Sequence, residues 1–166
     1  MFRIKPIDEV DQRALYDEAK SQLRALLEGE RAWMGNLSNF SSLLFHLVPE
    51  LNWAGFYLFD GEKLILGPFQ GKPACTQIAM GHGVCGTAAS TRTTQRVEDV
   101  HRFPGHIACD PDSRSEVVVP LIVGDQLKGV LDLDSPITNR FDATDAFEIE
   151  QLTRILIEAT DWPETF

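Results

Sequence analysis

The chain has 166 residues, of which 43% are hydrophobic, enough for one globular domain with its own core. Its 25 acidic residues outnumber 15 basic ones and give a net charge of −10, which argues against nucleic acids and anionic membranes as partners. No stretch has the apolar length of a membrane span, and the N-terminal MFRIKPIDEV lacks the apolar core of a signal peptide, so we expect a cytoplasmic protein.

Two amphipathic helices are predicted within residues 8–48. They cover residues 8–28 and 31–47, where apolar side chains recur at helical spacing between polar ones. Gly29 is a suitable residue to end the first of them.

The middle of the chain, residues 51–135, predicts short antiparallel strands joined by turns. The expected strands are residues 53–59, 63–69, 73–80, 95–97, 116–123 and 127–134. Asp60-Gly61 and Gly124-Asp125 are suited to hairpin turns between neighbouring strands.

Two segments interrupt these strands. Residues 81–90 predict a tight turn that enters a short helix, and residues 98–115 form a long polar loop of the kind that carries function. A closing helix is expected over residues 142–161. Its apolar stripe is expected to comprise Phe147, Leu152, Ile155, Leu156 and Ala159. The whole chain, residues 1–166, therefore predicts a single α+β domain, with an antiparallel sheet covered by the N- and C-terminal helices.

Three cysteines are candidates for thiol chemistry, because their odd number argues against a structural disulfide framework. Cys109 lies in HIACD within the long polar loop, and Cys75 is expected to begin a strand. Cys85 lies in GHGVCGTAA near the expected helix start, where the helix dipole would favour a thiolate. A nucleophilic thiol with a resolving partner competes here with the ordinary alternative of buried, inert cysteines.

Metal binding is a second use for these residues. His82 and Cys85 are three residues apart, and His106 and Cys109 repeat that spacing. The intervals are not those of a zinc finger or ribbon, so we expect no metal site.

Acidic residues in two neighbouring strands are the second chemical feature. Asp132 and Asp134 alternate with leucines and so project from one face of their strand, and Glu116 could lie near them across the hairpin. This face is either simply solvated or an acidic pocket. In a pocket, mutual repulsion would raise the pKa of at least one carboxyl, which could donate a proton while an ionised neighbour holds an ammonium group.

Six segments in order resemble one family, the free methionine-(R)-sulfoxide reductases, which are stand-alone GAF domains. They are NWAGFYL (52–58), LGPFQGKPACT (66–76), GHGVCGTA (81–88), HIACD (106–110), SRSEVVVPL (113–121) and GVLDLDS (129–135). The resemblance covers about residues 20–160 and includes all three cysteines. His82 departs from the pattern, since an arginine is more usual at that position.

The resemblance implies a GAF-like fold and reduction of free methionine-(R)-sulfoxide. It makes Cys109 the nucleophile and Cys75 the residue that closes a disulfide with it, while Cys85 is an auxiliary or rival nucleophile. Glu116, Asp132 and Asp134 occupy acidic pocket positions, and Trp53 and Tyr57 form an aromatic wall. No bound cofactor is implied, an external dithiol such as thioredoxin would recycle the disulfide, and a symmetric homodimer is the default assembly.

The main alternative is a sensory GAF module that binds a small ligand, such as a cyclic nucleotide, without catalysis. Fold alone does not decide between the two functions. Against a sensor, the sequence has no attached output domain or long signalling helix, and three cysteines are more than a binding pocket needs. A zinc or redox sensor is the third interpretation.

Overall fold

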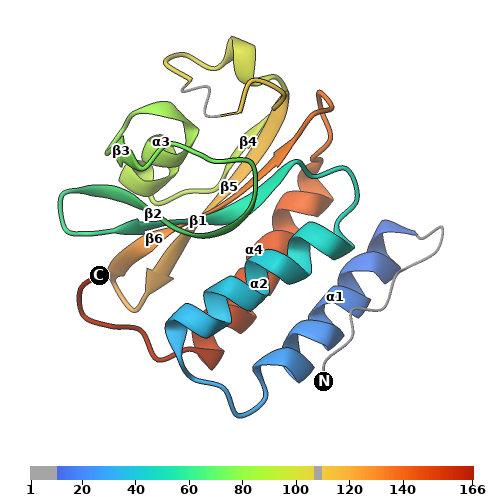
Figure 1. The fold of residues 1–166 in the computed structure, drawn as a ribbon. Coiled ribbons are helices and arrows are strands. Elements are labelled where there is room, and N and C mark those ends of the chain that lie inside the picture. Colours follow the sequence, from blue (N-terminus) through green and yellow to red (C-terminus); the bar gives the residue numbers. More distant parts are fainter. Residues whose placement is uncertain (1–10, 107–109) are drawn as a thin grey trace.

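A six-stranded antiparallel sheet forms the centre of the molecule in the computed structural model, which describes residues 11–106 and 110–166. The strands are β1 (Trp53–Phe59), β2 (Lys63–Gly71), β3 (Gln77–Ala79), β4 (Gln95–Val97), β5 (Ser115–Val123) and β6 (Gln126–Ser135). Their order across the sheet is β3-β2-β1-β6-β5-β4, and neighbouring strands are antiparallel (Figure 1). The sheet predicted from alternating apolar segments and turns is thereby confirmed.

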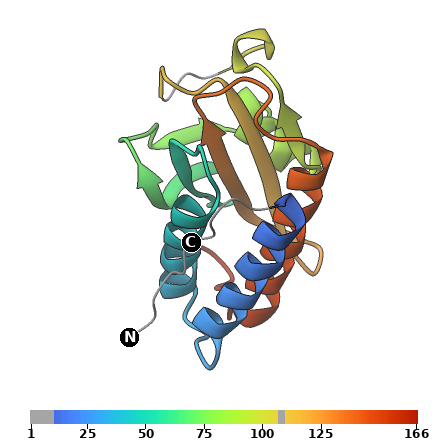
Figure 2. The same ribbon diagram turned by 90° about the vertical axis from the view of Figure 1, so that its right-hand side faces the viewer.

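Helices cover both faces of this sheet. Figures 1 and 2 show α1 (Gln12–Leu27), α2 (Trp33–Leu47) and α4 (Ala143–Ala159) on one face. The other face carries α3 (Gly83–Thr91) and a short 3₁₀ helix, η1 (Val100–Arg102). None of the described helices combines the length and the apolar character needed to cross a membrane.

Alternation along the strands divides the core into two apolar clusters. In β6, Leu131 and Leu133 pack toward the three-helix layer, whereas Val130 faces α3. Side chains of successive strand residues point to opposite faces, so one strand serves both clusters. Asp132 and Asp134 share the face of Val130, as the alternation predicts.

Two expectations about these elements are wrong, and part of a third lies outside the described residues. The predicted strand 73–80 shrinks to β3, and Cys75 lies in the preceding loop, because Pro73 lacks the N–H needed for strand pairing. Phe147 is 56% exposed, and Ile149 instead lies in the buried stripe of α4. Residues 8–10 of the first predicted helix lie outside the described residues, and α1 begins after its N-cap, Asp11.

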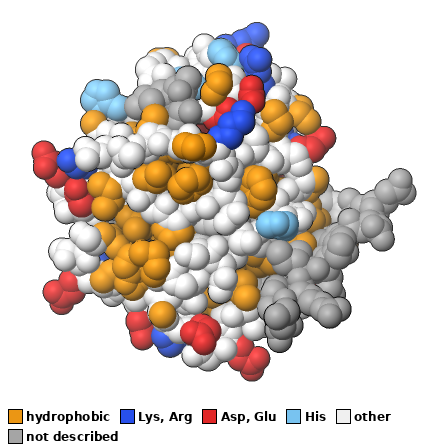
Figure 3. All heavy atoms as spheres, viewed as in Figure 1, with side chains coloured by type: hydrophobic (Ala, Val, Ile, Leu, Met, Phe, Trp, Pro, Cys, Tyr) orange, Lys and Arg blue, Asp and Glu red, His pale blue; other side chains and the backbone are white. Residues whose placement is uncertain are grey.

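Figure 3 shows how the side chains are distributed over one face of the molecule. In the view of Figure 3, acidic side chains lie around the edge, and hydrophobic side chains gather in patches nearer the middle. This distribution agrees with the net charge of −10, since like charges spread over a surface repel one another less.

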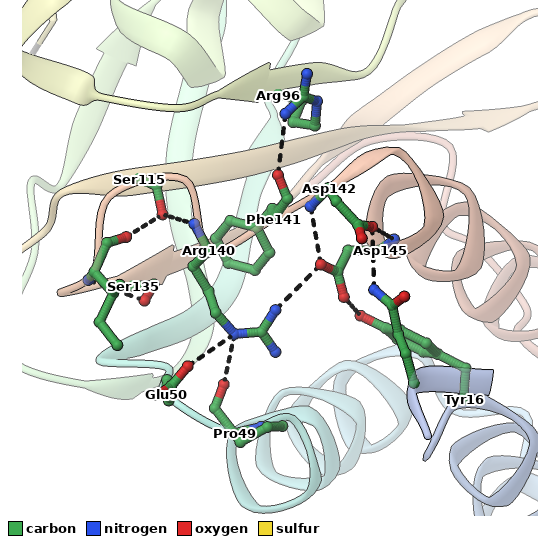
Figure 4. Close-up of polar contacts among 12 residues, drawn as sticks. Tyr16, Pro49, Glu50, Arg96, Ser115, Ser135, Arg140, Phe141, Asp142 and Asp145 are labelled. Carbon is green, nitrogen blue, oxygen red and sulfur yellow. Dashed lines mark hydrogen bonds and ion pairs between the residues drawn. The ribbon is translucent and has the colours of Figure 1, made fainter. Parts of the chain in front are cut away.

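A buried polar network joins the helical layer to the sheet (Figure 4). Asp145, in the first turn of α4, accepts hydrogen bonds from the Tyr16 hydroxyl at 2.6 Å and from the Arg140 guanidinium at 3.1 Å. Arg140 also donates to the Pro49 carbonyl at the end of α2 and pairs with Glu50. Three helices are therefore joined through one buried carboxylate, which is 1% exposed.

The same network reaches the ends of β5 and β6. Ser115 and Ser135 are paired in register, and the Ser115 hydroxyl accepts a hydrogen bond from the Arg140 backbone N–H. Ser115 donates to the carbonyl of Ile137, whose N–H in turn donates to the Ser135 hydroxyl. These bonds fix the residues directly next to Glu116 and Asp134.

We expect the substitution Asp145→Ala to lower the free energy of unfolding by about 1–3 kcal/mol, because it leaves the buried Tyr16 hydroxyl without its partner and removes one of the partners of Arg140. Urea denaturation would measure the loss. The control is Asp161→Ala, which removes an exposed ion pair with Arg31 and should cost at most about 1 kcal/mol. Equal losses in the two variants would contradict a stabilising role for the buried network.

Candidate active site

A pocket with about 500 Å³ of empty space, partly open to solvent, lies on the α3 face of the sheet. Its lining residues are Trp53, Tyr57, Pro73, Ala74, Ile78, His82, Gly83, Val84, Cys85, His106, Asp110, Ser113, Glu116, Asp132 and Asp134. The structure therefore brings together six of the eight site residues predicted from the sequence. The other two are Cys75, which neighbours the lining residue Ala74, and Cys109, which lies outside the described residues.

Strand pairing gathers the three acidic side chains on one wall of this pocket. Glu116 of β5 lies directly opposite Asp134 of β6. Asp132 precedes Asp134 by two residues in β6, so its side chain lies on the same face. Glu116 and Asp132 are each only 5% exposed, and Asp134 is partly buried. The expectation that Glu116 approaches the two aspartates is confirmed, and these two buried side chains exclude the solvated-face interpretation.

Burial disfavours ionisation of all three carboxyls, and repulsion by neighbouring carboxyls adds to this effect for Glu116 and Asp134. Burial raises the pKa of Asp132 to about 7. The pKa of Glu116 lies well above its ordinary value because of burial and the nearby Asp132 and Asp134. Burial, with the charge of Asp132, also raises the pKa of Asp134. The pocket can therefore hold protonated carboxyls near neutral pH, which can act as acids or hydrogen-bond donors.

Cys85 lies in the first turn of α3 and points into the acidic wall. Its thiol donates to Asp132 Oδ2 at 3.3 Å and lies 3.9 Å from Glu116 Oε1. Burial and these two carboxyls raise the pKa of the Cys85 thiol well above its ordinary value. The expectation that the helix start makes Cys85 a thiolate is therefore wrong, because burial and negative neighbours outweigh the helix dipole.

A stacked aromatic wall lies beside the carboxyls on the same face of the sheet, because β1 pairs with β6 and Trp53 is the register partner of Asp134. The rings of Trp53 and Tyr57 lie 5.9 Å apart at an interplanar angle of 20°, and Phe69 stacks on Trp53 at 5.3 Å. Gly55 lies between Trp53 and Tyr57 on the same face of β1, and its lack of a side chain leaves room for the stacked rings. A Cβ atom at Gly55 would lie 2.6 Å from the Trp53 ring and closer still to Phe69.

The aromatic wall also holds the loop that carries Cys75. The Tyr57 hydroxyl donates to the carbonyl of Cys75 at 3.1 Å, and the Trp53 indole N–H donates to the carbonyl of Lys72 at 3.2 Å. Cys75 is disulfide-bonded, whereas Cys85 is a free thiol.

An ion-pair group joins this loop to residues that follow Cys109 in the sequence. The Lys72 ammonium contacts Asp110 at 3.3 Å and also Asp112. Asp110 is 6% exposed and accepts a further hydrogen bond from Asn52. The hydrogen bonds from Asn52 and the Asp112 N–H, together with Lys72, lower the pKa of Asp110 despite its burial.

Sequence reasoning missed three members of this group, Asn52, Lys72 and Asp110. All three belong to segments that carry the family resemblance, and Asp110 directly follows Cys109. Their position in those segments was the signal that could have identified them as site residues. Their mutual contact could not be predicted, because it joins loops 38 residues apart.

Comparison with known proteins places this arrangement in a family. The model of the GAF domain matches residues 13–159. The free methionine-R-sulfoxide reductase of Escherichia coli is 44% identical over 160 residues, which cover 95% of this chain and 97% of that protein. The protein of the same name from Saccharomyces cerevisiae is 44% identical over 155 residues, covering 89% of this chain and 86% of that protein.

A solved structure agrees with these sequence matches. The free methionine-R-sulfoxide reductase of Neisseria meningitidis, in complex with its substrate, superposes with a TM-score of 0.91 at 41% identity, covering 96% of this chain and 95% of that one. Fold and sequence are thus both similar to the same group of proteins. This chain belongs to the GAF-domain family and, within it, to the free methionine-R-sulfoxide reductases.

Proposed function

We propose that this protein reduces free methionine-(R)-sulfoxide to methionine with cysteine thiols. The observation that carries the proposal is the acidic pocket, in which three largely buried carboxyls lie next to a stacked aromatic wall and the loop of Cys75. The names of the similar proteins from Escherichia coli, Saccharomyces cerevisiae and Neisseria meningitidis support the same activity.

The pocket suits a free amino acid with an apolar side chain. The rings of Trp53 and Tyr57 offer an apolar surface for the methyl and methylene groups next to the sulfoxide. An ionised carboxyl of the acidic wall attracts the substrate ammonium, which a peptide-bound residue lacks. A neighbouring carboxyl that keeps its proton donates it to the sulfoxide oxygen.

In the first chemical step, Cys109 is the nucleophile that attacks the sulfoxide. Its thiolate attacks the sulfoxide sulfur, and a pocket carboxyl protonates the sulfoxide oxygen. The oxygen then passes from the substrate sulfur to the Cys109 sulfur as the new sulfur–sulfur bond breaks, which releases methionine and leaves a sulfenic acid on Cys109. The described residues His106 and Asp110, on either side of residues 107–109, both line the pocket, which supports this assignment.

The second step regenerates the enzyme through a disulfide. The Cys75 thiol attacks the sulfur of the sulfenic acid, water leaves, and a Cys75–Cys109 disulfide forms. The bonded state of Cys75 and the free state of Cys85 support this pairing in a chain with three cysteines. Thioredoxin or another external dithiol then reduces the disulfide by exchange, and no bound cofactor is required.

Cys85 is a weaker candidate for the first attack. The nucleophile is the thiolate, and burial beside Asp132 and Glu116 keeps the Cys85 thiol protonated. An auxiliary role is compatible with this setting, because the thiol already donates to Asp132.

The proposal also covers the cellular compartment and the oligomeric state of the enzyme. We place the enzyme in the cytoplasm, where thioredoxin-type dithiols keep thiols reduced. We also propose a symmetric homodimer formed through the three-helix layer, on which Met34 of α2 and Phe147 of α4 are half exposed.

Free methionine-(R)-sulfoxide should be turned over, with little reduction of the S epimer or of peptide-bound sulfoxide. The acidic wall binds a free ammonium group, which acylation removes. The assay measures NADPH consumption with thioredoxin and thioredoxin reductase on the resolved epimers. Equal rates on the N-acetyl R sulfoxide would contradict the ammonium argument, and tight binding without turnover would favour a sensory module.

The substitutions Glu116→Gln and Asp134→Asn should each lower the reductase rate by about 10²–10⁴-fold if the residue supplies the proton. Both amides keep the size of the side chain, so the urea midpoint should change little. Methionine release from the R epimer gives the rate, and Glu62→Gln, an exposed acidic position, is the matched control. Near-normal rates in both pocket variants would show that these carboxyls have no part in the reaction.

Single-turnover experiments without reductant should separate the three thiols. Cys109→Ser should form no methionine, because the attacking sulfur is absent. Cys75→Ser should still form about one equivalent per site and leave a sulfenic acid that a dimedone-type reagent traps, since attack precedes resolution. In the unmutated protein, peptide mapping after turnover should find a Cys75–Cys109 disulfide.

Cys85→Ser is the control that decides between the two candidate nucleophiles. It should retain the single turnover, at a rate changed only by loss of the hydrogen bond to Asp132. If this variant forms no methionine while Cys109→Ser does, the nucleophile is Cys85.

A further inference from the structure

Three potential metal ligands converge in the acidic wall. Cys85 Sγ, a Glu116 carboxylate oxygen and an Asp132 carboxylate oxygen all lie within 4.8 Å of one another. They come from α3, β5 and β6, so three separately anchored elements fix their positions. Their exposed fractions are only 4%, 5% and 5%.

The spacing of these atoms fits a tetrahedral metal ion. Zinc-to-sulfur and zinc-to-oxygen bonds at a tetrahedral angle place the sulfur and oxygen about 3.5 Å apart. The sulfur of Cys85 lies 3.3 Å from Asp132 Oδ2 and 3.9 Å from Glu116 Oε1, on either side of that value. Shifts of a few tenths of an ångström would therefore bring both sulfur–oxygen distances to the tetrahedral value.

A buried carboxylate oxygen without a hydrogen-bond partner points to a cation at the same place. The second oxygen of Asp132, Oδ1, is buried and has no hydrogen-bond partner among the described residues. Among the described lining residues there is also no lysine or arginine that would compete with a metal ion for the three carboxyls. Buried carboxylates are ordinarily paired or coordinate a metal.

We propose that Cys85, Glu116 and Asp132 bind a thiophilic divalent cation of the zinc class, which blocks the pocket reversibly. A thiolate ligand selects such an ion over magnesium or calcium, which take oxygen ligands. On binding, the protons of the thiol and of any protonated carboxyl pass to solvent, and nothing is oxidised or reduced. Three protein ligands leave a fourth position for water.

This assignment differs from the sequence-based metal hypothesis. That hypothesis combined His82 and His106 with two cysteines, whereas the convergent group in the described residues takes one cysteine and two carboxylates. The ion acts as an inhibitor and not as a cofactor, because it occupies the wall that the substrate would use. Only this inhibitory consequence rests on the proposed function.

Cobalt titration of the reduced protein tests the site directly. The double variant Cys75→Ser/Cys109→Ser retains Cys85 as its sole thiol. Anaerobic addition of Co²⁺ should give one equivalent bound per chain and a thiolate-to-cobalt charge-transfer absorption band, which Zn²⁺ then removes. No thiolate band, or a cobalt spectrum typical of oxygen ligands alone, would overturn the proposal.

Matched variants on this background locate the ligands. Cys85→Ser should abolish the band, and Asp132→Asn should weaken cobalt binding by at least about tenfold, because even second-shell substitutions cost that much. Asp110→Asn removes a carboxylate from the same pocket but outside the group, and cobalt binding should be unchanged. A band that survives Cys85→Ser would refute the site.

Two further measurements distinguish failure of the metal site from misfolding of a variant and from failure of the proposed function. If circular dichroism shows that the double variant is unfolded, comparison of the reduced unmutated protein with Cys85→Ser gives the same contrast. In turnover assays, Zn²⁺ should raise the apparent KM for the sulfoxide and not lower kcat. Cobalt binding without any reductase activity would leave the metal site intact and contradict only the proposed function.

Discussion

The rest of the structure depends on one constraint: three carboxyls are removed from water on one face of a sheet, and their desolvation costs free energy. Glu116 and Asp134 lie opposite each other, and Asp132 lies two residues from Asp134. Removing such groups from water is expensive unless they become neutral or find partners. Burial raises their pKa values, with added repulsion for Glu116 and Asp134, so the site gains proton donors as a direct result of its geometry.

The opposite face of the same strands supplies the stability that this arrangement requires. Val117, Leu131 and Leu133 are fully buried against the helical layer. The polar network around Arg140 fixes Ser115 and Ser135, the neighbours of Glu116 and Asp134 (Figure 4). Strand alternation thus lets an apolar core and an acidic site share each strand, because successive residues point to opposite faces of the sheet.

Much of the fold could be predicted from the sequence, because its signals are local. The alternation of Leu131 to Asp134 determines which side chains share a face, and the turns at Gly61 and Gly124 determine the hairpin register. Contacts between loops could not be predicted, since the pairing of Lys72 with Asp110 depends on the tertiary fold. The protonation state of Cys85 was misjudged for the same reason, because its neighbours come from distant strands.

The ion pairs of Lys72 have a kinetic consequence. They join the loop of Cys75 to the residues that follow Cys109 without any covalent bond. In the proposed mechanism, holding these two segments together raises their effective concentration, so a short-lived sulfenic acid on Cys109 would meet Cys75 before a second oxidant reaches it. Lys72 is exposed, and ions in the surrounding solution weaken its attraction for the two aspartates. On that mechanism, the salt content of the cell would influence how well the oxidised thiol is protected from irreversible damage.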